Sequence, residues 1–204
     1  WGEKYFGIAQ GIEDFIMLTL GTGIGGAFFT KGRLYTGSGN LAGLFGHMTI
    51  DPLGVECNCG GRGCLEQYAS ATGIVRQARN AAAESPDGAL AKLLASQGDL
   101  SAKDVFTAAG VGDQAAKLVV ERAAEYLGAG IGSLLNLLNP ELVVLAGGVS
   151  EAGEPWLQLV SNGVQRYSTE AARKGVSIKL SKAPSRCGLF GAAAVAHAGG
   201  IARL

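Results

Sequence analysis

The order of the elements expected from the sequence predicts an α/β domain. Short strands separated by glycine turns come first, a long loop with most of the cysteines follows, and the second half alternates helices with apolar strands. This order is typical of a sheet covered by helices. A chain of 204 residues is also long enough for one domain with a substantial hydrophobic core.

Charge and hydropathy exclude several classes of protein. The chain carries 17 basic and 17 acidic residues, so its net charge gives no indication of binding to nucleic acid or to an anionic membrane. Glycine, asparagine or a charged residue interrupts each apolar stretch well before the roughly 18 residues of a membrane span. No secretion signal opens the chain. We therefore expect a cytoplasmic protein, with no nucleic-acid partner through this segment and no membrane partner.

The first residues, WGEKYFG, look like the end of a helix that is already under way and is closed by Gly7. The chain does not begin with methionine. We therefore expect it to continue on its N-terminal side.

The first strands lie around a glycine-rich turn. Short segments separated by glycine turns predict strands over Phe15 to Leu20, Gly25 to Thr30 and Arg33 to Tyr35. The turn at residues 21–26 holds four glycines in six positions. After it, the stretch that begins at Ser38 sustains neither the helical nor the strand period, so this long loop needs a bound group to be ordered.

Helices dominate the middle of the chain. A helix is expected from Leu65 to about Glu84, and a second, short one is capped by Ser101. The longest helix begins after its cap at Asp113 and ends near Asn139, because proline follows at once.

The C-terminal part alternates strands and helices. The pattern predicts a buried strand over 142–146, an amphipathic helix over 154–168 that Ser150 can help to cap, a strand over 175–183 and a closing helix over 189–204.

One histidine and three cysteines form the strongest chemical signal. His47, Cys57, Cys59 and Cys64 offer one imidazole and three thiolates, a set that closes tetrahedrally around Zn²⁺. Four protein ligands leave no open position for substrate, which favours a structural ion. The alternative is a set of unligated thiols in a glycine loop. Clustered cysteines of this kind fit metal binding in a reducing compartment better than a disulfide framework.

Two glycine turns follow apolar strands and are weaker signals. The amides of Gly21 and Gly23 and the hydroxyl of Thr22 suit a phosphate, although a plain hairpin turn explains them equally well. No helix follows, so this turn is neither a Rossmann nor a Walker motif. Gly147 and Gly148 end a buried strand, where α/β sheets bind ligands, or they form an ordinary turn.

Glu66 directly follows the loop that carries Cys57, Cys59 and Cys64, the cysteine loop, and stands at the start of a helix. Its charge there is favourable with the helix dipole, and this explains it without any function. The alternative is a carboxylate aimed at substrate hydroxyls.

Four segments together resemble the ROK family of repressors, open reading frames and kinases, within the actin-like ATPase superfamily. They are GTGIGG (21–26), GH (46–47), CNCGGRGCLE (57–66) and LAGGVS (145–150), in the order and spacing of the family. The stretch GCLEQYASATGIVRQA is more similar to the family's bacterial glucokinases than to its repressors. The resemblance implies that residues 1–204 are the C-terminal lobe of an actin-like ATPase (ribonuclease H-like) fold, with a mixed sheet, flanking helices and a zinc-binding loop.

The resemblance also implies a sugar kinase with two lobes, which binds a hexose, most simply glucose, and Mg·ATP in the cleft between them. His47 would ligate zinc and donate to a sugar hydroxyl, and Glu66 would accept from sugar hydroxyls. The implied nucleotide contacts are Gly21, Thr22 and Gly23 at the phosphates and Gly147 and Gly148 beside adenosine. Family members are often dimers or tetramers, which implies a homo-oligomer.

Two features depart from the pattern of family kinases. Their general base, an aspartate in an Asn-Asp-Ala segment, would lie before Trp1, so we expect this chain alone to be inactive, without the N-terminal lobe. Leu44 stands where they have a glutamate that meets the sugar. One such lost contact is worth roughly 1.5 to 3 kcal/mol, about one to two powers of ten in affinity. The resemblance leaves the sugar-sensing domain of a ROK repressor as an alternative function. Leu44 alone argues for a third, a catalytically dead sugar-binding relative.

Overall fold

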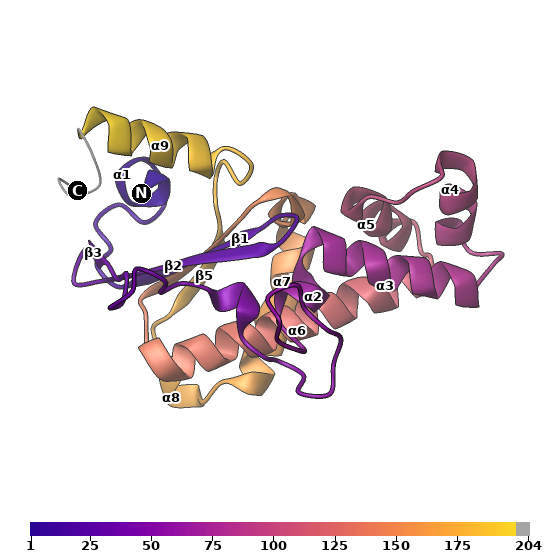
Figure 1. Ribbon diagram of the computed structural model, residues 1–204, viewed down its shortest axis with the longest axis horizontal. Helices are drawn as coiled ribbons and strands as arrows, with labels where there is room; N and C mark the ends of the chain where they lie inside the picture. The colour runs from indigo at the N-terminus through magenta and orange to yellow at the C-terminus, as the bar shows by residue number, and fades with distance from the viewer. Residues whose placement is uncertain (199–204) are drawn as a thin grey trace.

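The structure, a computed structural model, describes residues 1–198 and forms a sheet with helices on both faces (Figure 1). The strands are β1 (Phe15–Leu20), β2 (Ile24–Thr30), β3 (Arg33–Leu34), β4 (Leu142–Ala146) and β5 (Ser177–Leu180). The longer helices are α3 (Ala71–Glu84), α4 (Ala89–Gln97), α5 (Ala102–Gly110), α6 (Gln114–Leu138), α7 (Glu154–Tyr167) and α9 (Cys187–His197). The short ones are α1 (Gly2–Phe6), α2 (Glu66–Ala69), α8 (Glu170–Arg173) and the 3₁₀ turns η1 (Phe45–His47) and η2 (Gly148–Ala152).

The sheet is mixed, as expected. Its strand order is β3-β2-β1-β4-β5, in which β1 and β2 pair antiparallel while β1, β4 and β5 are parallel. Thr19 lies opposite Ala146 in the register of the two central strands. Because these strands are parallel, the glycine turns that follow them emerge at the same edge of the sheet.

The central strands carry apolar side chains on both faces because both faces are covered. Along β1, Ile16 and Leu18 enter the large core beneath α3, α6 and α7, whereas Phe15 enters a smaller core on the opposite face. That second face is covered by the N-terminal segment, where the edge of the Trp1 ring meets the Phe29 ring at a centroid distance of 4.8 Å. In Figure 1 the helices α1 and α9 lie side by side over this face.

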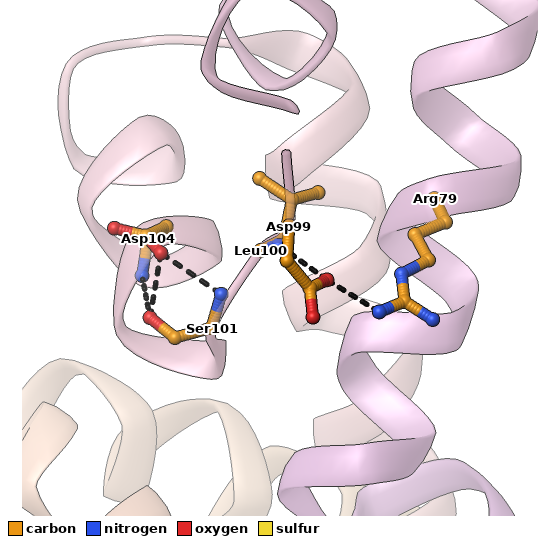
Figure 2. A network of polar contacts seen from close by, with 5 residues as sticks. All are labelled: Arg79, Asp99, Leu100, Ser101 and Asp104. Atoms are coloured by element: carbon orange, nitrogen blue, oxygen red, sulfur yellow. Dashed lines mark hydrogen bonds and ion pairs between the residues drawn. The ribbon is translucent and has the colours of Figure 1, made fainter. Parts of the chain in front are cut away.

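A network of polar contacts fixes the start of α5 (Figure 2). Ser101 Oγ accepts the amide of Asp104, whose carboxylate accepts the amide of Ser101, which together form a capping box. Asp99, which lies just before this capping box, forms an ion pair with Arg79 of α3. The Asp99 carboxylate also accepts the amide of Leu100 at 2.7 Å. The predicted cap at Ser101 is confirmed, and the network joins α5 to α3.

The helix expected from Leu65 to Glu84 is interrupted at Ser70. This residue is extended (φ −79°, ψ 165°), and its hydroxyl accepts the amide of Gly73, so it caps α3 and separates it from α2. The expectation that Ser150 caps the next helix is wrong. Its hydroxyl donates to the carbonyl of Ala146 at 2.9 Å, because a 3₁₀ turn intervenes before α7.

The boundaries of most other elements agree closely with the sequence, but β5 covers only Ser177–Leu180 of the strand expected over 175–183. The asparagine at 139 takes a left-handed conformation (φ 43°) at the end of α6, just before the proline. The last expected helix is described as far as residue 198, and its remaining residues lie outside the described part of the chain. Within that part, no helix has both the length and the apolar character needed to cross a bilayer.

Candidate active site and metal centre

Four donor groups converge in the loop between η1 and α2. The ligand atoms of His47, Cys57, Cys59 and Cys64 all lie within 4.8 Å of one another. Cys59 Sγ is 3.6 Å from Cys64 Sγ, and His47 Nδ1 is 3.8 Å from Cys57 Sγ. Zn–S bonds of 2.3 Å in a tetrahedron place neighbouring sulfurs about 3.8 Å apart, so the cluster has the dimensions of a zinc site.

The backbone of the loop builds this cluster. An isolated antiparallel bridge joins Thr49 to Cys64, which brings the histidine end of the loop against its cysteine end. Gly63 has φ +66°, and a Cβ there would lie 1.6 Å from the carbonyl oxygen of Asp51, so only glycine fits this crossing. The fold of the loop therefore depends on particular backbone conformations that hydrophobic periodicity does not reveal.

Hydrogen bonds to sulfur support the cluster from outside. The amide of Gly61 donates to Cys59 Sγ at 3.4 Å, and Gln67 Nε2 donates to Cys57 Sγ at 3.6 Å. The amide of Gly61 lowers the pKa of Cys59, whereas burial raises the pKa of Cys64 to about 12. A bound cation would displace the thiol protons, as metal binding by cysteine requires.

Tyr68 connects the loop to the helices. Its hydroxyl accepts the amide of Val55 and donates to Asp51, both at 3.2 Å, and its ring stacks on Tyr126 of α6 at a centroid distance of 4.1 Å. Arg122 lies over the Tyr126 ring. The role of Tyr68 could not be predicted from the sequence, since a single tyrosine in a helix forms no recognisable motif.

The two glycine turns lie against each other at the end of the sheet. Gly147 has φ +87°, and a Cβ there would lie 2.4 Å from the carbonyl oxygen of Leu20, the last residue of β1. The other turn is closed by a hydrogen bond from the amide of Gly21 to the carbonyl of Gly23, and Thr22 at its tip is exposed. The structure thus brings together two turns that are more than 120 residues apart in the sequence.

Glu66 joins the cysteine loop to the first glycine turn. Its Oε2 accepts the amide of Ile24 at 3.1 Å, and its Oε1 lies 3.9 Å from Cys57 Sγ. A Cβ on Gly23 would lie 2.3 Å from Oε2. The predicted metal residues and the predicted phosphate turn are therefore in one connected site, with this carboxylate between them.

A hollow of about 440 Å³ adjoins Gly148. It is formed by α5 and η2, and its lining includes Phe106, Lys103 and Glu151. The edge of the Phe106 ring meets Trp156 of α7 at 5.3 Å. Nothing in the sequence linked α5 to the second glycine turn, because only the tertiary packing brings them together.

Leu44 lies just before His47, whose amide donates to the Leu44 carbonyl at 3.0 Å. The leucine side chain is 57% exposed. An apolar side chain so exposed contributes little to the core, and its exposure alone does not indicate a ligand.

An α/β lobe with these two turns and this cysteine loop defines a member of the ROK family, whose profile matches residues 1–199; the chain belongs to that family. It is 39% identical over 191 residues to a glucokinase of Halalkalibacterium halodurans, covering 93% of this chain and 58% of the relative. It is 30% identical to the DNA-binding transcriptional dual regulator NagC of Escherichia coli, covering 96% of this chain and 47% of the regulator. The resemblance seen in the sequence is confirmed.

Solved structures also place the chain in the ROK family. A ROK family glucokinase from Streptomyces griseus, in complex with glucose and AMPPNP, superposes with a TM-score of 0.86 at 35% identity. The match covers 95% of this chain and 64% of that structure, so the chain spans less than two thirds of these relatives. The fold is accordingly the α/β fold with a mixed sheet found in ROK glucokinases, which belongs to the actin-like ATPases.

Proposed function

We propose that this chain is the C-terminal lobe of an ATP-dependent hexose kinase that converts glucose to glucose 6-phosphate. The observation that carries the proposal is the meeting of two glycine turns at the carboxyl ends of β1 and β4, with Glu66 beside one of them. Similarity to glucokinases over nearly the whole chain supports the same reaction. We further propose that the protein is cytoplasmic and forms a homo-oligomer.

The nucleotide is assigned to the glycine edge of the sheet. The amide of Gly23 and the hydroxyl of Thr22 would hold the phosphates of Mg·ATP, because free amides in a tight turn bind anions. Gly21, whose amide already donates to the Gly23 carbonyl, would lie beside the phosphates and shape the turn. Gly147 and Gly148 would lie beside the adenosine. The hollow between α5 and η2 has room for a nucleoside and a lysine at its rim, which supports this placement.

The sugar is assigned to the two ends of the cysteine loop. His47 would bind zinc through Nδ1, which faces Cys57, and donate to a sugar hydroxyl through Nε2. Glu66 would accept from sugar hydroxyls. Zinc held by four protein ligands has no open position, so its contribution would be to keep these two residues in place.

The general base is not assigned to this chain. Following the resemblance, we propose that an aspartate in a segment preceding Trp1 removes the proton of the sugar hydroxyl and that the N-terminal lobe lies there too. Without that base, and with contacts to sugar and nucleotide from one lobe only, the 204-residue chain should not phosphorylate glucose at a useful rate.

The second candidate is the sugar-sensing domain of a ROK repressor. The 30% identity to the regulator NagC favours it. A sensor needs to bind sugar but has no need of the phosphate turn.

The decisive experiment is an assay of the parent protein with glucose and ATP, followed by formation of glucose 6-phosphate. Turnover supports the kinase. Absence of turnover with every hexose overturns it, and sugar-dependent release from DNA by the same protein would establish the repressor.

A further inference from the structure

Glu66 makes a contact that a sugar ligand alone does not explain. Its Oε2 accepts the amide of Ile24, the first residue of β2, at 3.1 Å. Ile24 is 5% exposed, and a buried backbone amide without an acceptor is costly. The Glu66 carboxylate therefore completes the hydrogen bonding of the turn between β1 and β2.

The turn is shaped to admit this carboxylate. A Cβ on Gly23 would lie 2.3 Å from Glu66 Oε2, so the glycine leaves the space through which the side chain reaches Ile24. No positive φ is needed at this position. The small size of the glycine leaves the carboxylate in its place.

The other end of Glu66 lies beside two of the four donor residues, Cys57 and Cys64. The residue follows Cys64 by two positions, and its Oε1 lies 3.9 Å from Cys57 Sγ. The next residue, Gln67, donates to the same sulfur from its side chain and to the Cys64 carbonyl from its amide. The main chain of Glu66 is thus positioned by residues that would bind the metal, whereas the contact of Oε1 with the Cys57 thiol would be lost with the thiol proton when a metal binds.

A second connection reaches the other end of the turn and does not involve the cysteine loop. The amide of Ala71, the first residue of α3, donates to the carbonyl of Gly21 at 2.8 Å. The first half of the turn is therefore held by a helix, and the second half by Glu66.

We propose that Glu66 is a positioning residue that couples the metal site to the glycine turn, so that an ion on His47 and the three cysteines orders Gly23 and Ile24 through the carboxylate. The inference rests on the proposed function, in which that turn holds the nucleotide phosphates. A structural metal would then support the nucleotide site as well as the sugar site.

The test is amide hydrogen exchange of the 204-residue chain with and without metal, with the visible absorption of Co²⁺ as an independent measure of metal binding. Removal of the metal should speed exchange at residues 23–25 about 10- to 100-fold, the effect of losing one charged hydrogen bond. Amides in the middle of β4 should not change.

Variants separate coupling from simple structural loss. Glu66→Ala should still give the Co²⁺ spectrum, but its turn should exchange fast whether or not metal is bound. Glu66→Gln keeps an oxygen that can accept from Ile24 and should restore the response. Glu56→Ala removes another carboxylate of the same loop, one that is exposed and paired with Arg62, and should behave like the wild type.

Gly23→Ala provides a second route if Glu66→Ala fails to fold. Its new Cβ displaces the carboxylate without removing it, so it should bind Co²⁺ and lose the response of Ile24. If Co²⁺ binds and the wild-type turn exchanges at the same rate with and without it, the coupling is wrong while the metal site stands. If no Co²⁺ spectrum appears, the metal site and the coupling both fall.

Discussion

Gly128 of α6 and Gly163 of α7 meet backbone against backbone. A Cβ on Gly128 would lie 2.6 Å from the Cα of Gly163. Both glycines are buried, in the two helices that cover the large core. The same helix α6 also contacts α2 and α3.

Gly128→Ala should therefore destabilise the protein, although alanine is the better helix former. The new methyl group meets the backbone of α7 at Gly163 and Val164, and overpacking of this kind costs about 1 to 3 kcal/mol. Gly110→Ala is the matched control, because Gly110 ends a helix with open space around its Cα and should gain up to about 1 kcal/mol. Thermal unfolding of both variants checks the prediction, and equal melting temperatures would contradict it.

Asp113 ties two helices together and should make stability depend on pH. Its Oδ1 accepts the amide of Ala116 at 2.8 Å and its Oδ2 that of Ala89 at 2.6 Å. Partial burial acts to raise the pKa of Asp113, but the backbone amides outweigh it and hold the pKa below its ordinary value of 3.8. A carboxyl with a depressed pKa stabilises the fold above its unfolded pKa, and this contribution is lost as the pH falls through the folded pKa.

Asp113→Ala should thus lower the free energy of unfolding by about 1 to 2 kcal/mol at neutral pH, the value of a helix cap. The difference from the wild type should shrink below pH 4. Urea unfolding across pH measures it. Asp87, which is exposed in the turn just before α4, is the control, and Asp87→Ala should leave the free energy of unfolding unchanged.

The metal site predicts a stability that depends on zinc. Chelation should lower the melting temperature, because an ion bound only by the folded state stabilises it by about 2.7 kcal/mol at 100 times Kd. Cys59→Ala should abolish the effect of chelation. Cys187→Ala should retain it, since Cys187 begins α9 and lies outside the cluster. If neither chelator nor added zinc changes the melting temperature of the wild type, the metal site is ruled out.

The sheet and most helix ends could be predicted because each depends on a local pattern. Apolar runs next to glycine turns marked β1 and β4, and Ser101 and Asp113 marked two helix starts. The break between α2 and α3 at Ser70 was not predicted, because a serine between two helical segments is equally compatible with one continuous helix. The error at Ser150 has the same origin, since the hydroxyl found a carbonyl within its own turn.

The residues of the candidate site could be listed from the sequence, but their connections could not. The spacing of histidine and cysteines predicted a cluster, and their donor atoms do converge. The bond between Glu66 and Ile24 joins residues 42 positions apart, and the hollow beside Gly148 needs α5 to fold back. Both depend on tertiary packing, which periodicity and spacing do not encode.

Leu44 gives the prediction that bears most directly on the sugar. If this exposed leucine occupies the place of a glutamate that meets sugar hydroxyls, Leu44→Glu should tighten glucose binding. The gain of one charged hydrogen bond corresponds to about a 10- to 100-fold lower Kd. Leu53, which is 93% exposed on the same loop, supplies the control, and Leu53→Glu should leave the Kd unchanged because its side chain faces solvent. Titration calorimetry with glucose measures all three proteins, and equal affinities of wild type and Leu44→Glu would place the sugar elsewhere.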